Sequence, residues 1–186
     1  MPPSARNVFR LFVAVHPPTE IVRELVAALS RLELPDYRAV PVEQVHITLQ
    51  FIGDTPAPQL NETTESVRRS TEGVKGFDLQ PRLLIRLPER GRARLIAAEA
   101  DRPPGLMEIQ RRLAGRLARS ARRNPSDRFR PHLTLCRFRS PTNLARIDEP
   151  LEVEPFAVRE ISLMRSTLRP QGAQHDVVAS FSLEGG

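Results

Sequence analysis

Val45-His46-Ile47-Thr48-Leu49-Gln50-Phe51 places a His-x-Thr-Leu pattern inside an apolar run, and Pro131-His132-Leu133-Thr134-Leu135 repeats that pattern later in the chain. The 186 residues include only four histidines, and two of them open the same four-residue pattern. The copies start 86 positions apart (132 − 46), close to half the chain. We therefore interpret residues 1–186 as one domain with an internal duplication, whose halves supply motifs at 46–49 and 132–135.

Both motifs have the composition of β-strands, since they alternate and are rich in strand-forming residues. Alternate side chains of a strand share a face. Strict alternation predicts His46, Thr48 and Gln50 on one face of the first motif, against Ile47, Leu49 and Phe51 on the other. In the second motif it predicts His132, Thr134 and Cys136 on one face, against Leu133 and Leu135. Each strand should therefore bury an apolar row and present a histidine and a threonine together.

If the two strands lie side by side, two imidazoles and two hydroxyls converge on one spot. Two imidazoles with pKa values near neutrality can serve as general base and general acid in one reaction. Two hydroxyls can donate hydrogen bonds to a bound oxyanion. A single histidine in a strand is more often structural, but a matched pair favours chemistry. Two histidines without a matched carboxylate or cysteine cluster fall short of a zinc site, so we expect no metal.

Composition narrows the class of protein. An apolar fraction of 40% is enough for a packed core, and a formal net charge of +6, carried almost entirely by arginine, favours polyanionic partners. The single cysteine, Cys136, excludes an internal disulfide and fits a reducing compartment. There is no apolar run of membrane-spanning length and no signal-peptide pattern. We expect a cytoplasmic monomer that does not contact membranes.

The remaining pattern suggests the fold. Strand 7–15, helix 19–33 and strand 45–52 form one unit, which a turn at Gly53-Asp54 should close. Strand 93–100, helix 105–123 and strand 132–138 form the other. With further strands at 77–87, 156–165 and 175–183, the expected class is α+β: two pseudo-symmetric lobes, each an antiparallel sheet with helices outside, facing a central cleft. The arginine-rich outer face of helix 105–123 fits either a solvated surface or contact with an RNA backbone.

The doubled motif resembles the 2H phosphoesterase superfamily, and within it the RNA 2′,3′-cyclic phosphodiesterases, also called 2′-5′ RNA ligases. The stretches that carry the resemblance are Arg10–Val15, Val45–Gly53, Phe129–Arg137 and Leu163–Gly172. Three aromatic residues usual in that family are absent: a Trp ahead of the first motif, where Arg38-Ala39-Val40-Pro41 stands, a Trp near 94–98, and a Tyr where Gln174-His175 stands. These departures leave the favoured nucleotide open.

The resemblance implies hydrolysis of an RNA 2′,3′-cyclic phosphate to a 2′-phosphate, without a cofactor. It implies that His132 accepts the proton of water, that His46 donates a proton to O3′, and that Thr48 and Thr134 hold the nonbridging oxygens. The two histidine roles could also be exchanged. Arg137 matches a family arginine that would bind the phosphate, although strict alternation turns it away from the histidines unless a bulge or a strand end intervenes. Arg130 has the correct parity and is the second candidate.

Other activities stay open. The same site could join a cyclic-phosphate end to a 5′-hydroxyl, giving a 2′-5′ linkage. A small cyclic nucleotide such as ADP-ribose 1″,2″-cyclic phosphate, or a 2′-5′ oligoadenylate, could be the substrate in place of RNA. A non-catalytic RNA-binding module, in which the histidines are inert, is the alternative from another class.

Overall fold

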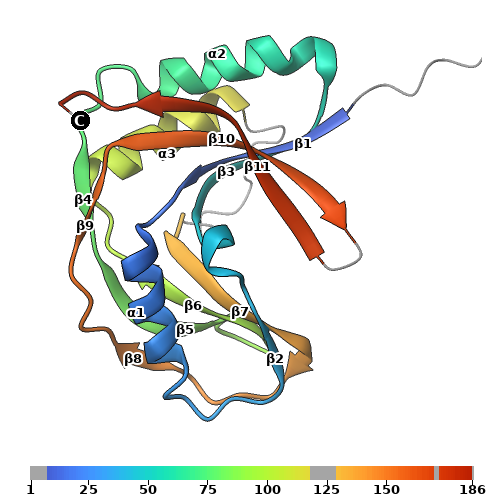
Figure 1. The fold of residues 1–186 in the computed structure, drawn as a ribbon, viewed down its shortest axis with the longest axis vertical. Helices are drawn as coiled ribbons and strands as arrows, with labels where there is room; N and C mark the ends of the chain where they lie inside the picture. Colours follow the sequence, from blue (N-terminus) through green and yellow to red (C-terminus); the bar gives the residue numbers. More distant parts are fainter. Residues whose placement is uncertain (1–7, 118–128, 170–171, 186) are drawn as a thin grey trace, which may run out of the picture.

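The computed structural model describes residues 8–117, 129–169 and 172–185 (Figure 1). In chain order the elements are β1 (Val8–Val15), α1 (Thr19–Leu29), β2 (Tyr37–Ala39), the 3-10 helix η1 (Val42–Gln44), β3 (Ile47–Pro56), the 3-10 helix η2 (Ala57–Gln59), α2 (Leu60–Thr71), β4 (Phe77–Leu79), β5 (Pro81–Leu87), β6 (Ala93–Ala100), α3 (Pro104–Leu117), β7 (His132–Thr142), β8 (Asp148–Pro150), β9 (Phe156–Val158), β10 (Glu160–Arg169) and β11 (Gly172–Ser182). None of the helices in these ranges has the length and apolarity needed to cross a membrane.

Nine of the described strands form one sheet that divides into two antiparallel groups, and β4 and β9 form a separate two-stranded sheet. One group has the order β11-β10-β1-β3, and the other continues as β7-β6-β5-β8. Strand β2 pairs with the same edge of β7 as β3, further along the strand. Every pairing between named strands is antiparallel. Between β3 and β7 the register contains a single pair, Ile47 with Leu133. The predicted α+β class is confirmed, and the two groups are consistent with the two expected lobes.

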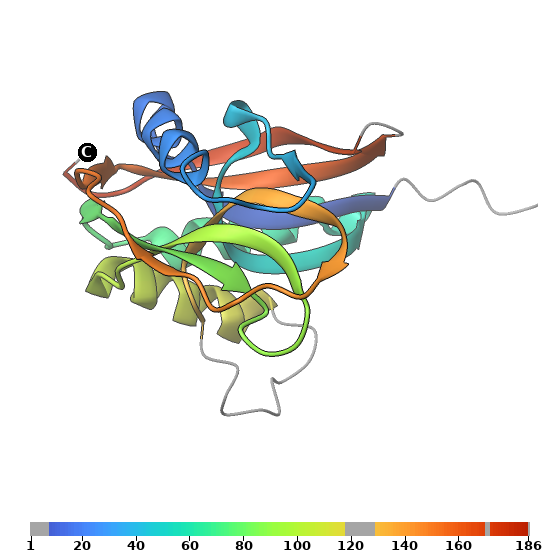
Figure 2. The ribbon, with the colours of Figure 1, turned by 90° about the horizontal axis from the view of Figure 1, so that it is seen from below.

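The helices lie outside the strands, but two of them are exchanged between the groups. Helix α1 follows β1 in the chain and packs near β7, whereas α3 follows β6 and packs on β3 beside α2 (Figures 1 and 2). Their apolar faces are buried, as at Leu25 of α1 and at Ile109 and Leu113 of α3. One apolar cluster therefore runs through both groups and fixes their relative position.

Several predicted boundaries are wrong, and two of them show the physical reason. Gly53-Asp54 does not end the first motif strand, because β3 continues to Pro56 and pairs with β1 along its whole length. Gly53 instead supplies a positive φ of 80° at an irregularity within the strand, a conformation that glycine adopts without strain. The predicted strand 77–87 divides into β4 and β5, which pair with different partners. The end of predicted helix 105–123, beyond Leu117, lies outside the described residues.

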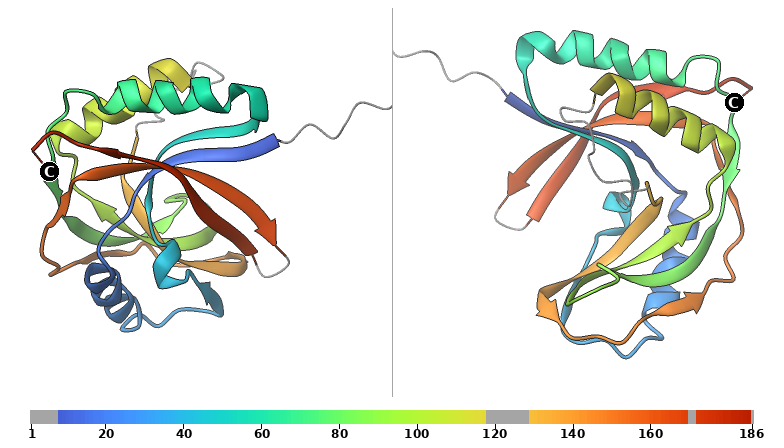
Figure 3. Two further views of the ribbon diagram at one scale, coloured as in Figure 1. Left: turned by 45° about the horizontal axis from the view of Figure 1, so that its top comes forward. Right: turned by 180° about the vertical axis from the view of Figure 1, so that it is seen from behind.

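Toward its loop the β10–β11 hairpin diverges from β1 (Figure 3), and the pairing of β10 with β1 ends at Ser166 opposite Arg10. The hairpin strands stay paired from Glu160 with Ser182 to Arg169 with Gly172. The body of the hairpin brings His175, far along the chain, to the neighbourhood of β1. This placement adds residues to the site that the motifs alone do not contain.

Candidate active site

The two motifs cross at the Ile47–Leu133 pair. Both side chains are fully buried in the core, so the residues on either side of them point to the opposite face. Extending the antiparallel register by one residue each way puts His46 beside Thr134, and Thr48 beside His132. The two histidines and two threonines therefore surround a local two-fold axis. We call the face of β3 and β7 that carries these four side chains the histidine face.

Each imidazole is held in the same way by the backbone two residues earlier. The Nδ1 atom of His46 lies 2.7 Å from the carbonyl oxygen of Gln44, the last residue of η1. The Nδ1 atom of His132 lies 2.8 Å from the carbonyl oxygen of Arg130. Because a carbonyl only accepts hydrogen bonds, Nδ1 must carry the proton in both rings. Nε2 is then the nitrogen that each neutral imidazole offers to a substrate.

A β-bulge occurs at the same position of both motifs. Ala14 and Val13 of β1 pair with Thr48 and Gln50, so Leu49 is an extra residue on β3. Ala97 and Ile96 of β6 pair with Thr134 and Cys136, so Leu135 is an extra residue on β7. A bulge of this kind inverts the alternation of every residue that follows it. The fifth residue after each histidine, Phe51 or Arg137, therefore lies on the histidine face.

The bulges correct the prediction from strict alternation. Phe51 is not on the core face: it is 67% exposed and its ring lies 6.0 Å from that of Phe12. Gln50 and Cys136 are buried instead of facing the site. Arg137 pairs with Leu95, which shares a face of β6 with the partners of Thr134 and His132. The structure thus brings Arg137 to the same face as both motifs.

Sequence reasoning missed two histidines near His46. The ring centroids of His16 and His175 lie 5.9 Å and 5.1 Å from that of His46. Phe12, only 2% exposed, packs against two of these rings, with its ring centroid 5.0 Å from that of His46 and 4.9 Å from that of His175. His16 follows β1 and His175 lies on β11, and neither belongs to a repeated motif. The sequence feature that could have indicated them is the small number of histidines, because all four in the chain lie near one another at this site.

This environment lowers the pKa of His46 to about 4. Burial is the main cause because it disfavours the charged ring, and the positive charges of His175, His16 and His132 act in the same direction. The hydrogen bond to the Gln44 carbonyl opposes them. His46 is therefore neutral near pH 7 in the unliganded protein. An anion placed beside the ring would favour the imidazolium and raise this pKa.

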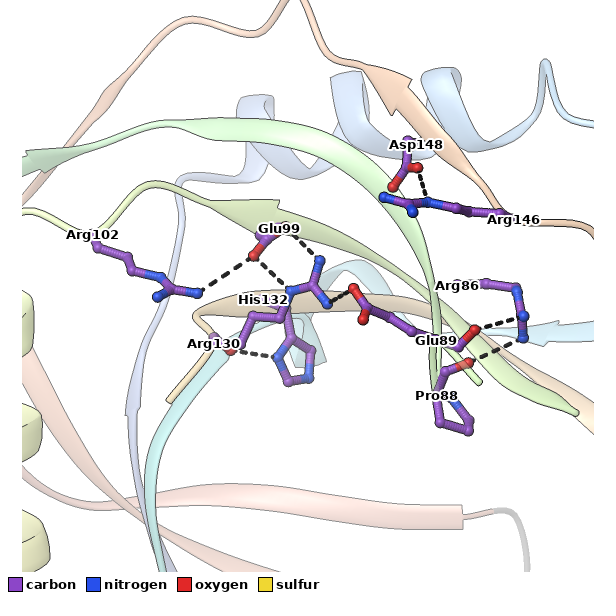
Figure 4. A network of polar contacts seen from close by, with 9 residues as sticks. All are labelled: Arg86, Pro88, Glu89, Glu99, Arg102, Arg130, His132, Arg146 and Asp148. Atoms are coloured by element: carbon purple, nitrogen blue, oxygen red, sulfur yellow. Dashed lines mark hydrogen bonds and ion pairs between the residues drawn. The ribbon is translucent and has the colours of Figure 1, made fainter. Parts of the chain in front are cut away.

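Arg130, the second arginine candidate, is engaged by two carboxylates (Figure 4). Its Nε and Nη2 atoms donate to Glu99 at 2.6 Å and 2.7 Å, and its Nη1 atom donates to Glu89. Glu89 sits on a turn that Arg86 holds by donating to the carbonyls of residues 88, 89 and 91. These contacts hold Arg130 in place, and its backbone carbonyl orients His132. The guanidinium of Arg130 is therefore less free to bind a ligand than that of Arg137.

The threonine hydroxyls and Arg137 contrast with Arg130. Within residues 8–117, 129–169 and 172–185, neither Thr48 nor Thr134 uses its hydroxyl in a hydrogen bond, and Arg137 makes no ion pair. Both threonines are half-buried, and Arg137 is exposed. Two imidazoles, two unused hydroxyl donors and the unpaired guanidinium of Arg137 are therefore on one face of the described sheet. This set suits a phosphate ester.

Comparison with known proteins places the chain in a family. The model of the 2′-5′ RNA ligase superfamily matches residues 17–169. The chain belongs to this superfamily. Its 2H phosphoesterase signature is the pair of His-x-Thr motifs that cross at Ile47 and Leu133.

Relatives within the 2′-5′ RNA ligase superfamily match along most of their length. The RNA 2′,3′-cyclic phosphodiesterase of Thermus thermophilus is 31% identical over 182 residues, covering 95% of this chain and 91% of that protein. The enzyme of the same name from Escherichia coli is 27% identical over 163 residues, covering 85% and 87%. A crystal structure of a Thermus thermophilus protein superposes with a TM-score of 0.78 at 28% identity, covering 95% of this chain and 98% of that one. Escherichia coli LigT complexed with 3′-AMP has the same fold, with a TM-score of 0.79 at 24% identity, covering 95% and 99%.

The lowered pKa of His46 predicts how folding stability depends on pH. The unfolded histidine has a pKa of 6.5 and the folded one about 4, so the unfolded chain binds more protons between these values. Stability from this residue is then complete above pH 6.5 and is lost as the pH falls toward 4, by about 3 kcal/mol at most. We expect His46→Gln to flatten the fall in the free energy of unfolding between pH 7 and pH 4, measured by urea denaturation. Equal slopes for the variant and the wild type would contradict the prediction.

Proposed function

We propose that this protein hydrolyses the 2′,3′-cyclic phosphate at the end of an RNA to a 2′-phosphate by two-histidine acid–base catalysis. The observation that supports this most directly is the crossed arrangement of His46, Thr48, His132 and Thr134 on one face, with both imidazoles anchored through Nδ1. Relatives that match over more than nine tenths of the chain carry the name RNA 2′,3′-cyclic phosphodiesterase, and this supports the same activity here.

In the proposed reaction the cyclic phosphate lies over the local two-fold axis, between the two Nε2 atoms. Water attacks phosphorus as Nε2 of His132 accepts its proton, and the P–O3′ bond breaks as Nε2 of His46 donates a proton to O3′. Thr48 and Thr134 donate hydrogen bonds to the nonbridging oxygens, where negative charge increases in the transition state. The product keeps its phosphate on O2′. No cofactor takes part in any of these steps.

The donor role of His46 requires a proton that the unliganded ring does not hold at neutral pH. Its pKa is about 4 because the ring is buried among other histidines, and an anionic phosphate removes much of that penalty. Substrate binding should therefore be coupled to proton uptake by His46. In the exchanged assignment, the neutral ring of His46 would act directly as the base.

We assign phosphate binding to Arg137 and a positioning role to Arg130. Arg137 faces the site because of the bulge at Leu135, and none of the described carboxylates neutralises it. Arg130 is bound by Glu99 and Glu89, and its backbone carbonyl accepts the hydrogen bond from His132. An arginine fixed by two carboxylates would hold that carbonyl in place instead of reaching a substrate.

The other proposals concern the partner and the form of the protein. We propose RNA with a cyclic-phosphate end as the partner, with small cyclic nucleotides as simpler substrates of the same site. Joining of the cyclic end to a 5′-hydroxyl would use the same histidines with an alcohol in place of water. We propose that residues 1–186 work as a single cytoplasmic domain and as a monomer.

The direct test is turnover of a 2′,3′-cyclic mononucleotide and of an RNA oligonucleotide with a cyclic-phosphate end, both in EDTA. We expect a 2′-phosphate from each substrate, and the chelator should not change the rate. Adding an RNA with a 5′-hydroxyl tests for 2′-5′ joining in the same mixture. If both substrates stay intact while the RNA still binds, the protein is a binding module and the proposed hydrolysis is wrong.

A further inference from the structure

A second unpaired arginine lies next to Arg137. In the register between β2 and β7, Arg38 stands directly opposite Arg137. Directly opposed residues on antiparallel strands point to the same face of the sheet. Their neighbours in this register, Tyr37 opposite Phe138, pack against the core on the other face. Arg38 therefore lies on the histidine face, on the edge of β7 that pairs with β3 at Leu133.

This pair is unfavourable without an anion. Like charges that are directly opposite on neighbouring strands repel and destabilise the sheet. Both arginines are exposed, and no carboxylate in the described part of the chain forms an ion pair with either. Nearby arginines differ in this respect, because Arg130 binds Glu99 and Arg139 binds Asp36 at 2.7 Å. Two cations are thus held together, unneutralised, at one place.

The position of the pair relative to the motifs suggests its occupant. Arg137 lies three residues beyond Thr134 on the same strand, so its backbone is roughly 7–10 Å from that of Thr134. Arg38 is one strand further, about 5 Å away across the sheet. A phosphate at the motifs and a phosphate at Arg38 would therefore be separate groups, and Arg137 could contact either. Consecutive phosphates of one RNA strand meet this requirement, whereas a mononucleotide has only the first.

We propose that Arg38 and Arg137 form a second phosphate subsite that binds the last internucleotide phosphodiester of an RNA ending in a cyclic phosphate. The inference rests on the proposed function, since the first phosphate is placed at the histidines. The guanidinium of Arg38 donates charge-assisted hydrogen bonds to the nonbridging oxygens of that phosphodiester. Its role is binding of the polymer, not chemistry. The subsite would make oligonucleotides better substrates than 2′,3′-cyclic mononucleotides.

The test compares Arg38→Gln with wild type on a cyclic mononucleotide and on a short RNA with a cyclic end. For the RNA we expect KM to rise about five- to tenfold and the slope of log KM against log salt to fall by roughly 0.7, with kcat unchanged. For the mononucleotide, kcat/KM should stay within about twofold. The matched control is Arg139→Gln, which removes the same charge from β7 at a residue that Asp36 already neutralises. This variant should leave kcat and KM unchanged for both substrates.

Chemical removal of the phosphate charge gives an independent measurement. An RNA with a neutral methylphosphonate at its last internucleotide linkage should be a poorer substrate for wild type by the same five- to tenfold factor, about the effect of one charged hydrogen bond. On that RNA, Arg38→Gln should cause no further loss. The subsite would be overturned if Arg38→Gln lowered kcat/KM equally for the mononucleotide and the RNA. It would also be overturned if the loss caused by Arg38→Gln added to the loss caused by the methylphosphonate.

Failure of the subsite is distinguishable from failure of the proposed function. Turnover of the mononucleotide tests the histidine site without Arg38. If no substrate is turned over, equilibrium binding of an RNA with a 3′-phosphate still measures the subsite. Equal affinity of wild type and Arg38→Gln for that RNA would also overturn it.

Discussion

Replacing His46 or His132 by alanine is expected to lower kcat/KM for a cyclic-phosphate-ended RNA by about 10²- to 10⁴-fold, because each removes one of the two proton transfers. The loss should appear in kcat, since binding of the phosphate depends on Thr48, Thr134 and Arg137 as well. Steady-state kinetics at pH 7 would measure it. Thermal unfolding of both variants provides the control that they remain folded.

The same two variants can assign the acid and the base. In a 2′,3′-cyclic substrate whose bridging O3′ is replaced by sulfur, the leaving thiolate needs no proton. If His46 is the donor, His46→Ala should recover most of its lost rate on that substrate, whereas His132→Ala should stay as slow as before. Recovery by His132→Ala alone would show that the roles are exchanged. If both variants turned over the natural substrate at the wild-type rate, the two histidines would have no part in the mechanism.

Arg137→Gln is expected to have the second largest effect, a loss of about 10²- to 10³-fold in kcat/KM on mononucleotide and RNA alike. Its side chain pairs with none of the carboxylates in residues 8–117, 129–169 and 172–185, and the bulge at Leu135 turns it toward the histidines. Kinetics on the cyclic mononucleotide isolates the effect on the cyclic phosphate from that on the second subsite. A loss confined to RNA would move Arg137 wholly into the second subsite.

Arg130→Gln is the matched comparison, since it removes the same charge from the segment that leads into the same strand. We expect a smaller loss, about tenfold in kcat, because Arg130 acts through the carbonyl that holds His132. Arg130→Lys should recover part of it, because lysine can still pair with Glu99. A loss as large as that of Arg137→Gln, without recovery by lysine, would make Arg130 a phosphate ligand.

The class of fold and the residues of both motifs could be predicted because they depend on local patterns. Strands at the motifs and at 93–100 follow from apolar alternation, and the exposed polar side of each motif follows from the period of two. Alternation fails at Leu49 and Leu135 because both are apolar and buried like their neighbours, so nothing in composition marks them as extra residues. The bulges appear only when each strand is paired with its neighbour.

The supporting residues could not be predicted for a related reason. His16, His175 and Arg38 belong to strands or loops that pairing alone brings to the histidine face, across long separations in sequence. Glu99 illustrates the same limit, since it stands opposite His132 only through the register of β6 with β7. A motif identifies the groups that react, whereas the sheet determines which other side chains surround them.

The position of β1 within its sheet has a consequence during synthesis. This strand, the first element of the described chain, lies between β3 and β10, and β10 begins only at Glu160. At about 5–20 residues per second, roughly 7 to 30 seconds pass between synthesis of the two strands. Throughout that interval one edge of β1 has its backbone groups and apolar side chains without their final partners, the condition in which nascent chains associate wrongly. The nascent protein should therefore depend on ribosome-associated protection until the β10–β11 hairpin has emerged.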